Sequence, residues 1–243
     1  MGVPTLGCHC AVCKSSDPRD KRTRPSVLLS FSGKSVVVDT TPDFRFQMLR
    51  EPVERLDAVL LTHAHADHIM GLDDIRPFNL KQKAALPVYA SAETLAVIRR
   101  VFSYIFEEAP PMSSVPLVDL HEIASTFDLF GARIQPIPLA HGPMTVLGFR
   151  LGDFAYLTDF SAIPDESMAM LAGLNHLILD ALRDAPHPMH STVENSLAVV
   201  RELRPRQAWF THICHDLGHK ATNARLPENV GLAYDGLVLE AAL

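Results

Sequence analysis

The sequence predicts an α/β fold with two mixed β-sheets flanked by helices, a four-layer αβ/βα sandwich in a single domain over residues 1–243. Two observations predict it. Short apolar strands first follow one another in hairpins and then alternate with helical patterns, and this order occurs once in each half of the chain. No repeat, low-complexity stretch or linker separates the halves, and 243 residues with 47% hydrophobic side chains are enough for a substantial core.

In the first half, a hairpin is followed by alternating helices and strands. Strands are expected at residues 27–31, 35–39, 56–62 and 87–90, and helices at 40–50, from 69 to near 76, and at 91–106. Residues 109–114 (Ala-Pro-Pro-Met-Ser-Ser) break the last helix. The segment 103–116 is therefore a candidate lid or dimer contact, with a plain surface connection as the alternative.

The second half begins with consecutive strands and then gains helices. Strands are expected at residues 115–120, 126–130, 132–139, 146–151, 154–158, 176–180, 207–211, 231–234 and 236–240. Helices are expected at 164–171 and from Ser191 to about Leu203. The second of these has capping-box spacing between Ser191 and Glu194.

One motif stands at the junction of a strand and a helix. The apolar run Val59-Leu60-Leu61 is followed by His63, His65, Asp67 and His68, and Ile69 then begins a helical pattern. Imidazole and carboxylate groups are ligands of first-row divalent metals. The motif therefore predicts a metal site, whereas four solvated turn residues would be the alternative.

Three further residues of ligand type follow apolar strands elsewhere in the chain. They are His141, Asp159 and His212. Taken singly, they could be a turn histidine, a helix cap and a buried core histidine. Because residues at the carboxyl ends of strands gather at one edge of a sheet, their shared placement favours metal ligation. Seven ligands are enough for two metals, which together can activate a water molecule.

Three of the four cysteines are close together in the sequence. Cys8, Cys10 and Cys13 can wrap one tetrahedral zinc, with a fourth ligand from elsewhere in the chain. This segment is predicted to be an N-terminal zinc knuckle at about residues 8–13, and small buried side chains are the alternative. Cys214 stands alone and is expected to be a buried free thiol.

Composition limits the compartment and the partners. No apolar run is long enough for a membrane span, and the N-terminus lacks the pattern of a secretory signal, so a cytoplasmic protein without a membrane partner is expected. The net charge of −6 disfavours a nucleic-acid partner, because such binding depends on a cationic surface.

His63-x-His65-x-Asp67-His68, followed by His141, Asp159 and His212, resembles the metallo-β-lactamase superfamily. This resemblance implies the αβ/βα sandwich and a dinuclear active site. It assigns one metal to His63, His65 and His141 and the other to Asp67, His68 and His212, with Asp159 between them. Asp67 would also orient the attacking water and act as a catalytic residue. Zinc, manganese or iron would suit these ligands.

The cysteine motif is similar to the phosphoribosyl 1,2-cyclic phosphate phosphodiesterase (PhnP-like) branch of that superfamily. The resemblance implies a structural zinc held by Cys8, Cys10, Cys13 and His215. It also implies that His190, in His187-Pro-Met-His190, is a catalytic residue that donates a proton to the leaving oxygen. Arg45 and Arg76 are candidate phosphate contacts. Dimers are common in this branch, and the sequence leaves a homodimer open.

These features predict a metal-dependent hydrolase, a phosphodiesterase acting on a small cyclic ribose phosphate or a nucleotide-like phosphodiester. A transfer-RNA 3′-processing ribonuclease is the main alternative, although the segment 103–116 has no lysine or arginine for an RNA-binding arm. A dioxygenase on the same fold stays open, whereas a metal-binding interaction domain is disfavoured because it would need ligands missing and none is missing. A β-lactamase is disfavoured without an export signal, and a glyoxalase II-type thiolesterase is disfavoured because the chain ends in predicted strands.

Overall fold

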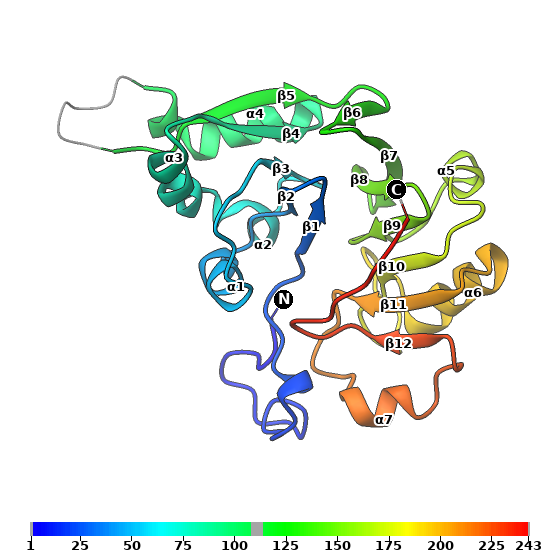
Figure 1. Ribbon diagram of the computed structural model, residues 1–243. Coiled ribbons are helices and arrows are strands. Elements are labelled where there is room, and N and C mark those ends of the chain that lie inside the picture. Colours follow the sequence, from blue (N-terminus) through cyan, green and yellow to red (C-terminus); the bar gives the residue numbers. More distant parts are fainter. Residues whose placement is uncertain (1, 108–113, 243) are drawn as a thin grey trace. The chain divides into compact units, whose positions relative to one another are not determined.

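The computed structural model describes residues 2–107 and 114–242 (Figure 1). Contacts within the chain divide it into two compact units. Residues 24–125 form one, and the segments 1–23 and 126–243 together form the other. Each unit has its own sheet and its own apolar core. Residues 108–113 of the candidate lid at 103–116 lie outside the described residues, and a single domain over residues 1–243 stays a prediction.

The unit of residues 24–125 contains a five-stranded sheet in the order β1-β2-β3-β4-β5. The first pair is antiparallel and the other pairs are parallel. Its apolar core includes Phe44, Leu56 and Ile75, each at most 1% exposed. The elements are β1 (Val27–Phe31), β2 (Lys34–Val38), α1 (Phe44–Arg50), β3 (Ala58–Leu60), α2 (Ala66–Ile69), η2 (Leu72–Ile75), α3 (Arg76–Gln82), β4 (Leu86–Ala90), α4 (Ala92–Val101), η3 (Ser103–Ile105) and β5 (Val118–Glu122).

The other unit contains a seven-stranded sheet in the order β12-β11-β10-β9-β8-β7-β6. Strands β9 to β12 are parallel to one another, and β6 to β9 are joined as antiparallel pairs. Helices α5, α6 and α7 contact β7, β11 and β12. The elements are η1 (Pro18–Asp20), β6 (Phe127–Leu129), β7 (Ala132–His141), β8 (Met144–Leu151), β9 (Phe154–Leu157), α5 (Asp165–Ala169), β10 (His176–Asp180), α6 (Val193–Leu203), β11 (Gln207–Thr211), α7 (His219–Asn223) and β12 (Val230–Leu232).

The predicted fold class is confirmed: the chain is α/β with two mixed sheets and flanking helices. Strands β10 and β11 have the predicted bounds because both are short apolar runs with polar residues on either side. In the described part of the chain, no helix is long and apolar enough to cross a membrane.

Three local predictions were wrong. The predicted helix that follows the histidine motif does not end near Arg76. Helix α3 begins there, and Pro77 occupies its first turn, where a missing N–H costs nothing. Residues 236–240 form no strand, and β12 ends at Leu232. The cap of α6 is Thr192, whose side chain accepts a hydrogen bond from Asn195 N, rather than Ser191.

Candidate metal centres

The histidine motif lies where β3 leaves the sheet of residues 24–125. The strand is apolar and fully buried, and the chain turns after Thr62 into the single turn of α2. This turn returns His68 to the side on which His63 lies: the ring centroids of His63 and His68 are 4.2 Å apart. His63 is 3% exposed and His68 is fully buried, so these polar rings are placed where water cannot satisfy them.

The rings of His63 and His65 bring two nitrogen atoms to the spacing of metal ligands. His63 Nε2 and His65 Nδ1 are 3.0 Å apart. Two nitrogens bound to one zinc at 2.0–2.1 Å stand about 2.9–3.3 Å apart for angles between 90° and tetrahedral. The other nitrogen of His63 is 3.0 Å from Thr62 Oγ1, and a ligand atom of Asp67 lies within 4.8 Å of one from His68. These donors therefore fit a divalent metal.

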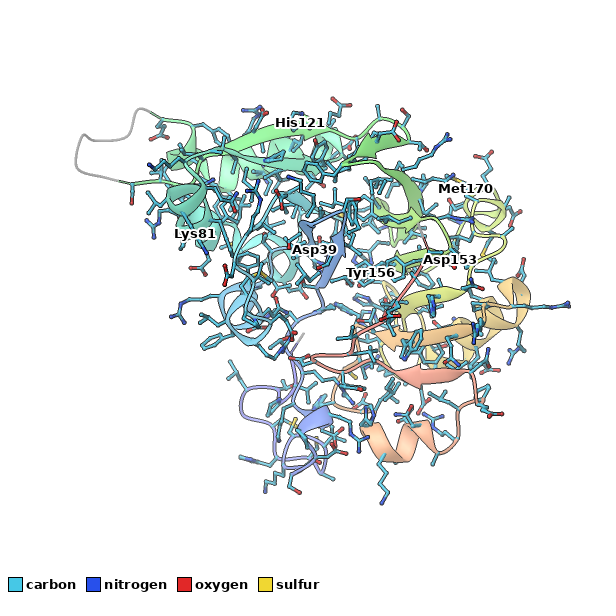
Figure 2. The ribbon with its side chains drawn as sticks, in the orientation of Figure 1. Asp39, Lys81, His121, Asp153, Tyr156 and Met170 are labelled. Carbon is cyan, nitrogen blue, oxygen red and sulfur yellow. The ribbon has the colours of Figure 1, made fainter. Side chains whose placement is uncertain are left out.

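Asp39 supports this group from the end of β2 (Figure 2). Its buried carboxylate accepts hydrogen bonds from Thr62 N at 2.8 Å, from Thr62 Oγ1 at 2.8 Å and from His68 Nδ1 at 2.7 Å. Because Nδ1 of His68 is held by the carboxylate, Nε2 carries the lone pair that can bind a metal. The sequence analysis missed Asp39, although it too follows an apolar strand.

The second group of donors lies in the other unit, at the ends of parallel strands. Asp159 follows β9, Asp180 ends β10 and His212 follows β11, and the parallel pairing of these strands brings their carboxyl ends to one edge. Ligand atoms of Asp159, Asp180, His190 and His212 all lie within 4.8 Å of one another. His212 Nε2 is 3.2 Å from Asp159 Oδ1. The expected clustering of strand-end residues is therefore present in this unit.

His141 joins this group as the last residue of β7. Its Nδ1 donates to the carbonyl oxygen of Met189 at 2.7 Å, which leaves Nε2 as the nitrogen available for a metal. A ligand atom of His141 lies within 4.8 Å of one from Asp159. The neighbouring Gly142 has a φ of +57°, and a Cβ there would lie 2.3 Å from the sulfur of Met189. The tight turn at Gly142 thus allows the close approach of the segment that carries Met189.

Three of these strand-end residues have a left-handed backbone. The φ angles are +66° for Asp39, +55° for Asp159 and +53° for His212. Residues other than glycine adopt this conformation at a cost, and such residues concentrate at functional sites. All three lie within two residues of the end of their strand, so the left-handed backbone occurs where the chain leaves the sheet.

Asp180 is the second site residue that the sequence analysis missed. Its Oδ2 accepts a hydrogen bond from His190 Nδ1 at 3.0 Å, and its Oδ1 is 4.0 Å from His212 Nδ1. Burial raises the pKa of the Asp180 carboxyl well above its usual value, while the nearby His212 acts in the opposite direction. The prediction of a strand at 176–180 already placed Asp180 at a strand end, so the signal was present.

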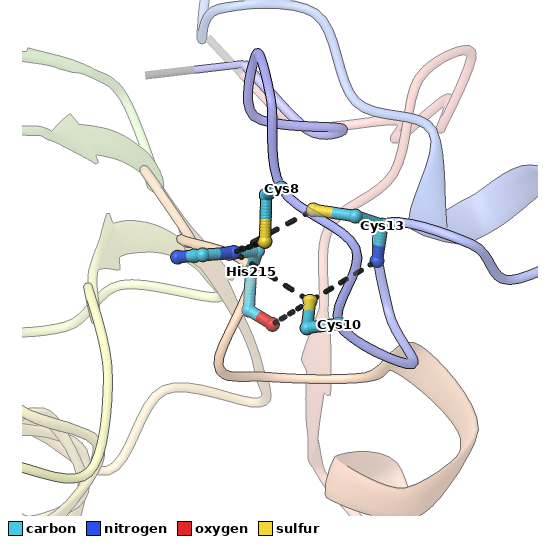
Figure 3. A group of neighbouring side chains, drawn as sticks. All are labelled: Cys8, Cys10, Cys13 and His215. Atoms are coloured by element: carbon cyan, nitrogen blue, oxygen red, sulfur yellow. Dashed lines mark hydrogen bonds between the residues drawn. The ribbon is translucent and has the colours of Figure 1, made fainter.

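The three N-terminal cysteines surround one nitrogen of His215 (Figure 3). The sulfurs of Cys8, Cys10 and Cys13 lie 3.1, 3.6 and 3.5 Å from His215 Nδ1. Ligands of a tetrahedral zinc with Zn–S near 2.3 Å and Zn–N near 2.05 Å stand about 3.6 Å apart. The four groups therefore fit a closed Cys₃His zinc site, the arrangement that the sequence predicts.

Backbone hydrogen bonds to sulfur further favour thiolates in this cluster. Cys13 N donates to Cys10 Sγ and Thr5 N donates to Cys13 Sγ. The Cys13 N–H is the largest of the effects that lower the pKa of the Cys10 thiol to about 6, whereas burial raises the pKa of Cys13. Cys214 lies outside the cluster as a free thiol, but it is half-buried rather than buried, and its partial burial raises its pKa.

A buried polar bridge holds the N-terminal segment beside the loop of His215. Asp20 Oδ1 accepts from His219 N at 2.7 Å, and Arg22 donates to the carbonyl oxygen of Leu217 at 3.2 Å. Arg22 also pairs with Asp20 at 3.3 Å. These contacts position the cysteine segment close to a residue about 200 positions further along the chain.

The candidate phosphate contacts have surface partners. Arg76 donates to the carbonyl oxygen of Ser114 at 3.0 Å and pairs with Asp73 at 3.5 Å. The guanidinium of Arg45 lies 5.9 Å from the centre of the Phe46 ring. The phosphate role of both arginines stays a prediction, as do the catalytic roles of Asp67 and His190.

The family model described as "Beta-lactamase superfamily domain" matches residues 34–213. The chain belongs to the β-lactamase superfamily. Within it, the chain is similar to the PhnP family: a crystal structure described as a new diphosphatase from that family has a TM-score of 0.94 and 50% sequence identity, over 100% of this chain and 94% of that one. This fold implies the use of divalent metals, as the two donor groups would allow.

Two curated relatives add to this comparison. A Porphyromonas gingivalis (strain ATCC BAA-308 / W83) protein named octanoyltransferase is 36% identical over 97% of this chain and 48% of its own length. A ribonuclease Z from Bradyrhizobium diazoefficiens is 27% identical over 56% of this chain and 46% of its own length. The chain thus spans about half the length of these relatives.

Proposed function

We propose that this chain is a metal-dependent hydrolase of small phosphodiesters, including phosphate groups joined in a diphosphate. The observation that carries the proposal is the pair of donor groups, each with imidazoles whose second nitrogen is held by a carboxylate, hydroxyl or carbonyl oxygen. The PhnP-family diphosphatase, 50% identical over the whole chain, supports phosphate as the reacting group.

The two groups of donors would together form one dinuclear site. His63, His65 and His141 would hold one metal, Asp67, His68 and His212 the other, and Asp159 would lie between them. When bound, the two divalent ions supply Lewis-acid polarisation and activation of water. Zinc, manganese and iron all accept this mixture of imidazole and carboxylate.

The chain's own residues would then bind, orient and move protons. Asp67 would accept a hydrogen bond from the attacking water and hold it in line with the bond to be broken. His190 would donate a proton to the leaving oxygen. Its ring is 13% exposed, lies 4.7 Å from the ring of His212 and is held by Asp180, so it is positioned beside the proposed metal ligands.

Phosphodiester and diphosphate substrates present related groups. When a diphosphate links two alcohols, each phosphorus carries one negative charge and two bridging oxygens, as a phosphodiester does. A small cyclic ribose phosphate, a nucleotide-like diester and a sugar diphosphate ester are therefore the substrates to compare. The natural substrate would be set by the walls of the pocket around the donors.

The test is hydrolysis by protein purified with zinc or manganese. Bis(p-nitrophenyl) phosphate should be cleaved, and His63→Ala and Asp67→Ala should each lose activity by at least about 100-fold, since both change groups that would bind or align reactants. Cys214→Ser is the matched control and should keep both activity and metal content. A fully metal-loaded protein that cleaves no phosphodiester or diphosphate would refute the proposal.

The cysteine cluster is proposed to hold a separate structural zinc. Three thiolates and an imidazole close the coordination shell, so no position is left for a substrate. This zinc should resist a mild chelator that removes the active-site metals. Four titratable thiols in the native protein before chelation would contradict the assignment.

Transfer-RNA 3′ processing is the second candidate function, because the ribonuclease Z relatives share 27% identity over part of the chain. The net charge of −6 weakens it, since a polyanionic substrate would be repelled. Incubation with a precursor transfer RNA that carries a 3′ trailer decides between this nuclease and the hydrolase of small phosphodiesters. Specific removal of the trailer at a rate above that of small diesters would favour the nuclease.

The relative named octanoyltransferase suggests a further comparison. This chain corresponds to 48% of that protein, and more than half of that protein has no counterpart here. We expect no release of octanoate from an octanoyl thioester by this chain. Metal-dependent release that is lost in Asp67→Ala would instead make the chain a thioesterase.

A further inference from the structure

His187 lies beside the candidate site but has no part in the chemistry proposed above. It is half-buried in the turn between β10 and α6, and its ring centroid is 4.9 Å from that of His190. Its Nδ1 accepts a hydrogen bond from the N–H of Met189 at 3.2 Å. A ring nitrogen that accepts carries no proton, so the proton of the neutral imidazole is on Nε2. This N–H donor at Nε2 has no hydrogen-bond partner among the described residues.

The turn that carries His187 is held in place by its own side chains. Arg183 donates to the carbonyl oxygen of Pro186, the residue before His187, at 3.0 Å. Arg225 donates to both carboxylate oxygens of Asp184 at 2.7 Å. The backbone that leads to His187 is therefore ordered without a ligand, so binding does not have to order it.

Met189 joins His187 to a proposed metal ligand. Its N–H donates to His187 Nδ1 at 3.2 Å, and its carbonyl oxygen accepts from His141 Nδ1 at 2.7 Å. The position of the His187 ring is thus set relative to His141 through a single residue. A group bound beside His141 therefore meets the His187 donor in a fixed place.

The donor of His187 is uncharged. Burial, followed by the nearby His190 and Arg183, lowers the pKa of the His187 imidazole below its ordinary value of 6.5. An uncharged N–H gains less from a phosphate anion than a cation would, and it suits an uncharged oxygen such as a hydroxyl. Because the ring neighbours His190, the proposed proton donor to the leaving oxygen, the group that it meets is the remainder of the leaving alcohol.

We propose that His187 is a specificity-determining residue: its Nε2–H binds a hydroxyl oxygen of the leaving alcohol, and the site thereby selects diesters of sugars and other polyols over diesters of simple alcohols. The inference rests on the proposed hydrolase function. It names the chemical feature of the leaving group that this turn recognises, and it leaves the breaking of the bond to phosphorus to the other residues of the site.

Two cyclic diesters that differ in one hydroxyl test the inference. Glycerol 1,2-cyclic phosphate and propane-1,2-diol cyclic phosphate share the five-membered ring and the alkoxide leaving groups, and only the first has a free hydroxyl. Wild-type protein loaded with zinc or manganese should prefer the first by about two- to tenfold in kcat/KM, the effect of one hydrogen bond between uncharged groups. The difference should lie in KM, because the hydroxyl does not react and is bound alike in the ground state and the transition state.

Two substitutions separate the roles of the two ring nitrogens. His187→Asn places its side-chain oxygen near the position of Nδ1, so it can still accept from Met189 N, but it has no donor at the position of Nε2. The preference for the glycerol diester should therefore disappear. His187→Gln places its NH₂ group near the position of Nε2 and should keep part of the preference.

His121→Asn is the matched control in the other unit. His121 pairs with Asp119 at 2.9 Å, and both side chains are part of β5. Its replacement should leave the preference unchanged. The metal content of all three variants should match that of the wild type.

Contrary results are distinguishable from one another. A wild-type protein that cleaves the two cyclic diesters equally well would overturn the inference. Loss of activity on both diesters together in His187→Asn, with loss of metal, would also overturn it and make His187 a support of the site. Cleavage of bis(p-nitrophenyl) phosphate alone would refute only the inference, whereas a metal-loaded protein that cleaves no phosphodiester would refute the hydrolase proposal.

A binding measurement on the wild type keeps the inference testable if His187→Asn does not fold. The imidazole NMR resonances of His187, assigned with His187→Gln, should shift when glycerol 1-phosphate is added and should shift less with propyl phosphate, which lacks the hydroxyls. Equal shifts with the two phosphates would overturn the inference.

Discussion

Replacement of Asp39 tests how the fold sets the tautomer of His68, a candidate metal ligand. Asp39→Asn keeps the size of the side chain but replaces one carboxylate oxygen with an amide NH₂. In the native protein Oδ1 accepts from Thr62 N, and Oδ2 accepts from Thr62 Oγ1 and His68 Nδ1, at 2.7–2.8 Å. Because Thr62 N can only donate, the amide oxygen keeps the place of Oδ1 and the NH₂ group takes the place of Oδ2, where it faces His68 Nδ1. At least one hydrogen bond to a charged group is lost, at a cost of about 1.5–3 kcal/mol in the free energy of unfolding.

The effect on metal binding follows from the tautomer of His68. An NH₂ group facing Nδ1 favours the lone pair on that nitrogen, so the proton moves to Nε2, where the metal would bind. Loss of such a supporting contact lowers metal affinity about 10–100-fold. This corresponds to about 1.4–2.8 kcal/mol of binding free energy. Competition with a chromophoric chelator measures the affinity, and urea denaturation of the metal-free protein measures stability.

Asp57→Asn is the matched control in the same unit. Asp57 is also a buried carboxylate, and it accepts hydrogen bonds from Ser35 N, Lys34 and Arg55 at the opposite ends of β2 and β3. Its replacement should lower stability and leave metal affinity unchanged. If Asp39→Asn binds metal as tightly as the wild type, the carboxylate supports only the fold and the reasoning about His68 is refuted.

Three other changes test separate parts of the structure. Cys13→Ser should remove one zinc per chain by elemental analysis, and retention of that zinc would contradict the cysteine cluster as a ligand set. Gly142→Ala should lower the free energy of unfolding by about 1–2 kcal/mol because the backbone there is left-handed. It should also lower turnover, because the new Cβ meets Met189. Gly173→Ala is the control: its φ is +77° and nothing lies within 4 Å of the new Cβ, so it should lose only stability. Burial lowers the pKa of His219, so the folded state binds fewer protons than the unfolded state, and the free energy of unfolding should fall as the pH drops below about 6.5. In denaturation measured as a function of pH, His219→Gln should flatten this decline. An unchanged slope would contradict the role of His219.

The sequence was most informative where apolar strands end in polar residues. The positions of His141, Asp159 and His212 at strand ends followed from periodicity alone, because a buried strand must be apolar until it leaves the sheet. The same rule would have identified Asp39 and Asp180. They were missed because the sequence does not show which strand-end carboxylates contact a histidine. That contact depends on tertiary structure.

Other features could not be predicted from local patterns. The end of the helix after the histidine motif was misplaced because Pro77 can either stop a helix or begin one, and only the packing of η2 and α3 decides between these. The pattern at residues 236–240 is apolar enough for a strand but pairs with no neighbour in the described chain. The join between His215 and the cysteines was implied by family resemblance and not by spacing, since the ligands lie at opposite ends of the sequence.

The cysteine cluster also has a consequence for the order in which the chain is made. Cys8 and His215 are 207 positions apart, so at about 5–20 residues per second the fourth ligand emerges roughly 10–40 s after the first cysteine. Residues 24–125, which have their own sheet and core, are complete long before that moment. The three thiols must therefore stay reduced and unpaired during synthesis, and capture of zinc becomes one of the last steps of folding.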